Sequence, residues 1–260
     1  MNKLLIILLC SHLYSQELLD SKNRIVLKNV LQQGLQYKLQ HVYTLNAEFS
    51  YAGESKTVYR SKDYRITLDV LKLHLDGGYT LYINCINGKN TIKGKLQIDK
   101  NFKITFWKNK TTTKLKSKKI ADLQMILRVI GIRFADRPIV KRKRWQLKDR
   151  WTCISPVPLQ NEALLMMEIK GKFRYWKDPD ELIAEIKFHG EALDILEHKR
   201  DLPSKYKMSS SMKGRLSYAA KKMFIKDMEL EMKFKFADIT HKDTYLYKLT
   251  TTLIEMKTLK

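Results

Sequence analysis

Alternation of apolar and polar residues runs through most of this chain and constrains its fold more than any other feature. In Met228–Phe236 every second residue is apolar, and the residues between are glutamate or lysine. Side chains of a β-strand point alternately to opposite faces, so this period predicts strands with one buried and one solvated face. The same alternation recurs in residues 36–53, 57–88, 94–110, 163–176, 181–196, 215–239 and 244–259.

Short turns separate these segments and predict their connectivity. Gly77-Gly78 and Asn87-Gly88 stand where a positive φ costs little, and Asp99–Asn101 separates two further strands. Long strands joined by short turns favour an antiparallel meander. Residues 191–196 fit a strand in this pattern, and they also fit a single helical turn.

One segment has a helical period instead. Ile120, Leu123, Leu127 and Ile130 are spaced by three and four residues, with Ser117 as a candidate N-cap and Gly131 as a stop. The predicted fold is therefore mainly β: a large curved antiparallel sheet or open half-barrel with one central amphipathic helix. Residues 16–260 are expected to form a single β-rich domain, with an alternative of two halves that meet near residues 117–140.

The first fifteen residues are typical of a secretory signal peptide. Lys3 precedes an apolar run from Leu4 to Cys10, and the small Ser15 stands before Gln16. Cys10 also fits a lipid-anchored alternative, although lipidation favours a small residue where Leu9 stands. No later stretch reaches the about 18 apolar residues of a membrane helix. We therefore expect an exported protein, periplasmic, envelope-associated or secreted, with no transmembrane helix in its mature chain.

Two cysteines remain after the predicted cleavage, Cys85 and Cys153. Alternation places both among apolar neighbours on their strands. In an oxidising compartment they form either a disulfide or two buried thiols, and both interpretations remain open.

The chain is strongly basic, with 50 Lys and Arg residues against 27 Asp and Glu residues and a formal charge of +23. Basic residues recur from Lys22 to Lys260, which predicts a diffuse positive field. Such a field attracts anionic envelope polymers and anionic lipid. It indicates no sequence-specific nucleic-acid binding.

The stretch VKRKRWQLKDRW, residues 140–151, concentrates this charge. Alternation sends Arg144, Lys148 and Arg150 to one face and Trp145 and Trp151 to the other, which predicts exposed cations and buried tryptophans. One interpretation is the wet face of a strand. The other is an anion site in which guanidinium groups fork onto phosphate or sulfate. Its candidate residues are Lys141, Arg142, Lys143, Arg144, Lys148 and Arg150.

Three short patches resemble a group of exported, functionally uncharacterised β-rich bacterial proteins. Leu31, Gly34 and Tyr37 match a Leu-x-x-Gly-x-x-Tyr strand entry. Pro138, Ile139 and Trp145 fit a mid-chain Pro-Val…Trp segment, with Arg142 and Lys143 where Gly-Asp is usual, and Gly214 and Tyr218 fit a late hairpin. The resemblance implies a fold type and an envelope location and brings no catalytic residues.

The motifs of common enzyme chemistries are absent from the sequence. His41, His74, His189, His198 and His241 form no close metal-binding pair, and there is no G-x-S-x-G elbow or P-loop. We therefore expect a non-enzymatic protein without metal or cofactor that binds an apolar ligand, such as lipid, or an anionic envelope polymer. The rival hypotheses are an outer-membrane β-barrel and an unrecognised hydrolase of envelope polymers.

The N-terminal pattern predicts a mature chain that begins at or near Gln16. Mass spectrometry of the extracytoplasmic protein checks this. Recovery of the intact Met1 form from the cytoplasm contradicts it, and a diacylated Cys10 replaces it with the lipid-anchored alternative.

Overall fold

The structure is a computed structural model that describes residues 24–25, 30–108, 117–132, 139–140, 150–158, 164–178, 182–197, 207–237 and 241–259. Its first half contains β1 (Arg24–Ile25), β2 (Leu35–Tyr51), β3 (Glu54–Leu73), β4 (Tyr79–Asn87), β5 (Asn90–Ile98), β6 (Ile104–Lys108) and helix α2 (Ser117–Ile130). Its second half contains β7 (Ile139–Val140), β8 (Arg150–Pro158), β9 (Leu164–Asp178), β10 (Ile183–Glu197), β11 (Lys207–Ala219), β12 (Phe224–Ala237) and β13 (His241–Thr258).

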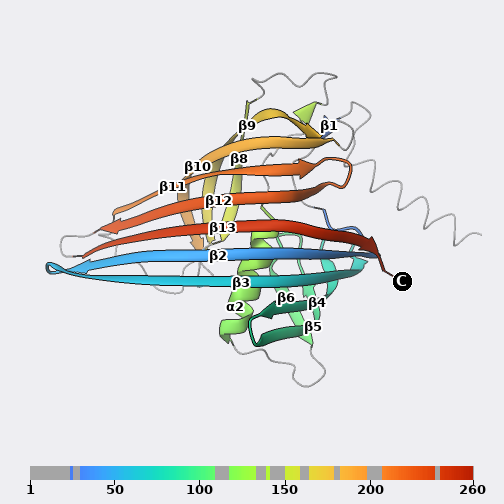
Figure 1. Cartoon of the computed structure of the whole chain (residues 1–260), viewed down its shortest axis with the longest axis horizontal. Helices are drawn as coiled ribbons and strands as arrows, with labels where there is room; N and C mark the ends of the chain where they lie inside the picture. The colour runs from blue at the N-terminus through green and yellow to red at the C-terminus, as the bar shows by residue number, and fades with distance from the viewer. Residues whose placement is uncertain are drawn as a thin grey trace, which may run out of the picture.

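Eleven of these strands form one antiparallel sheet in the order β6-β5-β4-β3-β2-β13-β12-β11-β10-β9-β8. Strands adjacent in the sheet are consecutive in the chain except in the middle, where β2 pairs with β13 and joins the two halves. The edge strands β6 and β8 do not pair with each other, so the sheet is open. The long strands lie side by side in Figure 1, and α2 runs across their direction. The predicted curved antiparallel sheet with one central helix is confirmed.

Alternation along most of the strands separates an apolar inner face from a polar outer face. On β2, Leu39, His41, Tyr43, Leu45 and Ala47 are buried, whereas the residues that alternate with them are more exposed. The inner residues of the neighbouring strands continue the same layer, and buried side chains from both halves of the sheet form one apolar cluster. The hydrophobic effect therefore acts on one face of one continuous sheet.

Helix α2 is anchored to the inner face by polar contacts around an apolar stripe. Asp122 accepts two hydrogen bonds of 2.8 Å from the Lys62 ammonium group on β3. The Gln124 amide donates to the Phe102 carbonyl at 2.7 Å and accepts from the Ile104 backbone at 2.7 Å. The helix thus contacts β3 and the turn between β5 and β6, and it also contacts β8 in the other half of the sheet.

The helix ends at Gly131 as predicted, but a left-handed backbone is not the reason. The positive-φ glycines among the described residues are Gly34, Gly53, Gly77 and Gly88. A Cβ at residue 131 would lie 2.7 Å from the Phe102 ring. Glycine is required there for close approach of an aromatic side chain.

The structure decides one further open alternative of the sequence analysis. Residues 191–196 belong to β10, so the helical-turn alternative was wrong for this segment. Cross-strand pairing with β9 supplies the backbone hydrogen bonds that a helical turn would otherwise make. Of the stretch 140–151, the structure describes Val140 in β7 and Arg150 and Trp151 in β8.

A buried polar pair lies on the inner face between β2 and β13. His41 is fully buried, and its Nδ1 atom lies 2.9 Å from the Thr251 hydroxyl. Burial lowers the pKa of His41 to about 4, because the apolar surroundings disfavour the charged imidazolium. His41 is therefore neutral in the folded protein at pH 7.

This burial predicts acid sensitivity. Between the unfolded pKa of about 6.5 and the folded value, the unfolded chain binds a proton that the folded chain does not, so stability falls as pH falls. The His41 contribution to the free energy of unfolding should decrease by up to about 3 kcal/mol between pH 7 and pH 4. Urea unfolding of wild type and His41→Gln across this range isolates the contribution. Parallel pH profiles for the two proteins would contradict the assignment.

Close packing of Phe188 on β10 against β11 leaves no space for a larger side chain at one position of β11. Phe188 pairs directly with Gly214, and a Cβ at residue 214 would lie 2.3 Å from the Glu229 carbonyl oxygen and 2.4 Å from the Phe188 ring. The buried phenyl ring therefore occupies the space above a glycine, and backbone limits any outward movement.

Gly214→Ala should therefore lower the free energy of unfolding by roughly 1–3 kcal/mol through overpacking. Ser211→Ala, an exposed change on the same strand, should stay within about 0.5 kcal/mol of wild type. Denaturant unfolding compares the two. Equal stability of both variants would show that the sheet accommodates the methyl group.

Candidate anion-binding face

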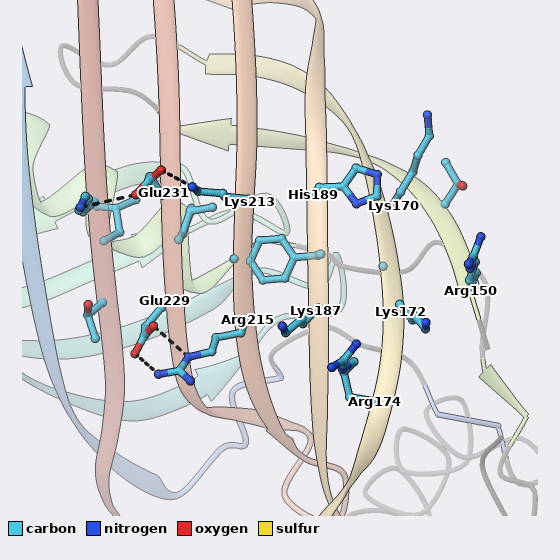
Figure 2. Close-up of a pocket in the computed structure, with 18 residues that line it drawn as sticks. Arg150, Lys170, Lys172, Arg174, Lys187, His189, Lys213, Arg215, Glu229 and Glu231 are labelled. Carbon is cyan, nitrogen blue, oxygen red and sulfur yellow. Dashed lines mark hydrogen bonds and ion pairs between the residues drawn. The ribbon is translucent and has the colours of Figure 1, made fainter. Parts of the chain in front are cut away.

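A hollow of about 950 Å³ lies on the outer face of β8 to β13, opposite the apolar core. Figure 2 shows its charged lining, with basic side chains on β8, β9, β10 and β11 and two glutamates on β12. The labelled residues are Arg150, Lys170, Lys172, Arg174, Lys187, His189, Lys213, Arg215, Glu229 and Glu231.

Sheet register arranges most of these residues in two rows perpendicular to the strands. The first row consists of directly paired residues on five neighbouring strands: Arg150, Lys172, Lys187, Arg215 and Glu229. The second row is Thr152, Lys170, His189, Lys213 and Glu231. Neighbouring members of a row lie about one strand spacing, about 4.8 Å, apart. Residues separated by up to 79 positions in the sequence thus form one surface.

On β11 and β12 the charges of this surface compensate each other. Arg215 donates from Nε and Nη2 to the two oxygens of Glu229 at 2.9 and 2.8 Å. Glu231 accepts from Lys213 at 2.9 Å and lies 3.5 Å from Lys248. The hydrogen bond from Arg215 lowers the pKa of Glu229, and that from Lys213 lowers the pKa of Glu231. Both carboxylates are therefore ionised, and each is engaged in an ion pair.

Four cations on β8, β9 and β10 lack this compensation. Lys172 pairs in register with Arg150 on one side and Lys187 on the other. Arg174 follows on β9 at an irregularity in the pairing. Among the residues that the structure describes, these four have no carboxylate within ion-pair distance. We call Arg150, Lys172, Arg174 and Lys187 the cationic cluster. Like charges directly opposite on neighbouring strands are destabilising, so the cluster does not arise from folding stability.

The second row carries less uncompensated positive charge on β8, β9 and β10. Lys170 forms an ion pair with Glu168 at 2.8 Å, and this hydrogen bond raises the pKa of Lys170. His189 is exposed and pairs in register with Lys170 and Lys213. The strongest uncompensated charge is thus confined to the first row and Arg174.

The structure describes one of the six anion-site candidates from the sequence. Arg150 is exposed on the edge strand β8 and begins the first row. Lys141, Arg142, Lys143, Arg144 and Lys148 lie outside the described residues, as do Trp145 and the side chain of Trp151. Sequence reasoning missed Lys172, Arg174 and Lys187. Alternation in residues 163–176 puts Lys170 and Lys172 on the polar face, but strand order and register decide which strands lie beside it.

Cys85 on β4 and Cys153 on β8 are both buried, and no disulfide joins them in this structure. Burial raises the pKa of the Cys85 thiol to about 12, so it stays protonated and unreactive. No group of His, Cys, Asp and Glu within the described ranges is arranged to hold a metal ion.

The apolar side of α2 is packed into the core of the sheet. Leu123, Ile126, Leu127 and Ile130 of the helix are at most 2% exposed and belong to the same apolar cluster as the inner residues of the sheet. The hollow described above lies on the charged face.

No protein-family model and no curated protein matches this sequence. Among solved structures, the chain is similar to a lipovitellin chain studied for lipid–protein interactions, with 10% sequence identity, a TM-score of 0.48 and coverage of 89% of this chain. It spans only 26% of that lipovitellin chain. An outer membrane channel from Pseudomonas putida F1 matches with 7% identity and a TM-score of 0.25, over 87% of this chain and 97% of the channel.

Helix α2 is too short and too polar to cross a bilayer, and the rest of the described chain offers no other candidate helix.

Proposed function

We propose that this protein is a non-enzymatic binding protein for a ligand that carries several anionic groups, and that the cationic cluster is its binding site. The observation that carries the proposal is the uncompensated row of Arg150, Lys172 and Lys187 on three adjacent strands. An anion on this row replaces cation–cation repulsion with attraction. The sheet backbone holds the three positions in place, so binding does not require the protein to order a loop.

The chemistry of the cluster suits phosphate or sulfate groups. Two arginines can each donate two parallel hydrogen bonds to such a group, and two lysines add compact positive charges. A partly apolar lining, with Phe188, Leu230 and Leu249 beneath the charged side chains, lowers the local dielectric and strengthens these interactions. Anionic envelope polymers and anionic lipid head groups both carry groups of this kind.

Uneven charge on the outer face supports a localised site over a uniform field. On β2 and β3 the outer face carries Glu48, Asp63 and Asp69 beside Lys38 and Arg65. Gln36 donates to Asp69 at 2.7 Å, and Lys38 pairs with Glu255. This region is mixed in sign, whereas the cationic cluster is positive only.

The state of the two glutamates favours binding over hydrolysis. A general acid must hold a proton near the working pH, whereas ion pairs lower the pKa of both Glu229 and Glu231. The carboxylates that line the hollow therefore lack the protonated member that an acid–base pair for polymer hydrolysis requires.

We further propose that binding occurs outside the cytoplasm. The basis for this location is the signal-like sequence of residues 1–15 and the resemblance to exported β-rich proteins. Anionic polymers and lipids of the envelope would be present in that compartment.

Charge removal tests the site. Arg150→Gln/Lys172→Gln/Lys187→Gln should bind long-chain polyphosphate at least about tenfold more weakly than wild type in a titration at fixed salt, because three charge-assisted contacts are lost. The dependence of log affinity on log salt concentration should also become shallower, since fewer counterions exchange.

A matched variant removes three exposed lysines elsewhere: Lys226→Gln/Lys233→Gln/Lys235→Gln. Lys233 pairs in register with Ser211 and Leu246, so it has no cationic neighbour directly opposite. This variant has the same net charge and should keep most of the affinity. Equal losses in both triple variants would mean that the whole surface binds as a diffuse field, and the localised site would be rejected.

A further inference from the structure

Carboxylates border the cationic cluster on three sides. Glu168 on β9 and Glu191 on β10 pair in register next to the second row, on its side away from the first row. Glu185 on β10 lies next to the first row, on its side away from the second row, and accepts a 3.1 Å hydrogen bond from Ser217. Glu229 and Glu231 close the side toward β13. We call these five residues the acidic frame.

The fourth side has a different character. It is the edge strand β8, whose outer positions in the described residues are Arg150, Thr152 and Ile154. No described strand lies beyond β8. An elongated ligand on the cluster therefore meets carboxylates of the described residues in both directions along the strands and toward β13, but not across β8. Figure 2 shows Glu229 and Glu231, the carboxylates on the side toward β13.

The size of the framed area limits what binds. The cluster spans three strands, about 10 Å across the sheet, and two alternate residues of β9, about 7 Å along that strand. Glu185 lies one alternate position from Lys187, about 7 Å along β10, and Glu168 lies two alternate positions from Lys172 on β9. Glu229 and Glu231 lie two strands from Lys187, about 10 Å across the sheet, and are already paired with Arg215 and Lys213. Phosphates that extend past the frame would face carboxylates, or cations that carboxylates already occupy.

We propose that the site accommodates a compact group of two or three neighbouring phosphates or sulfates, and that any longer anionic chain leaves across the edge of β8. This inference rests on the proposed function and defines its ligand: a short oligoanion, or the end of a long one, instead of the middle of a polymer. The acidic frame acts as the specificity element, because it repels whatever extends beyond the cluster.

A length series tests the inference. Affinity should rise about tenfold for each added phosphate from phosphate through pyrophosphate to tripolyphosphate, and then level off for longer chains. Long-chain polyphosphate should bind at most one protein at each of its two ends, whatever its length. Tight binding of free tripolyphosphate would show that a short free oligoanion is a sufficient ligand. Binding of long chains only, at a fixed number of proteins per chain, would show that the ligand is the end of a chain.

Removal of part of the frame should lengthen the preferred ligand. Glu229→Gln/Glu231→Gln releases Arg215 and Lys213, which extends the positive row over β11. Affinity for a five- or six-phosphate chain should then rise about tenfold over tripolyphosphate, whereas wild type shows no such gain. Glu48→Gln/Glu54→Gln, two exposed changes outside the frame, adds the same charge and should leave the length preference unchanged.

The outcomes separate this inference from the proposed function. Absence of binding to every member of the series overturns both. Binding that depends on the cationic cluster, but grows in stoichiometry with chain length and responds equally to both double variants, overturns the frame and leaves the anion site intact.

Discussion

Antiparallel pairing through one continuous sheet is the interaction on which the other features depend. Its period of two residues sends every side chain to the inner or the outer face, and its register decides which side chains become neighbours across strands. The inner face gains the apolar core that holds α2. The outer face acquires rows of directly opposed residues, and the row of Arg150, Lys172 and Lys187 is one of them. A slip of one residue in β9 would send Lys172 toward the core, so core burial also protects the geometry of the binding face.

Packing of the core explains how a rigid charged surface is maintained. Phe188 lies over Gly214 on the inner face, directly beneath the residues that line the hollow. Helix α2 contacts both halves of the sheet and is anchored by the Asp122–Lys62 ion pair and by the Gln124 amide. The hollow therefore sits on the back of a well-packed layer, which allows closely spaced cations to persist without a compensating carboxylate.

Much of this fold was predictable from the chain alone, because its strongest signals are local. The spacing of Leu123, Leu127 and Ile130 predicted the helix, and glycines at 77 and 88 predicted turns. Residues 191–196 were ambiguous, since cross-strand partners and not local spacing make them a strand. The binding face was only partly predictable. The dense basic stretch pointed to Arg150, but Lys172 and Lys187 became visible only when register placed three strands side by side.

The central claim is that the cationic cluster is retained for anion binding at some cost to folding. The most direct measurement is the free energy of unfolding of wild type and Lys172→Gln, each with and without tripolyphosphate. Without the anion, we expect the variant to be as stable as wild type or more stable by about 0.2–1 kcal/mol, because repulsion in the row is relieved. With saturating tripolyphosphate, wild type should become the more stable protein. A variant that is less stable without the anion, together with equal stabilisation of both proteins by it, would contradict the account.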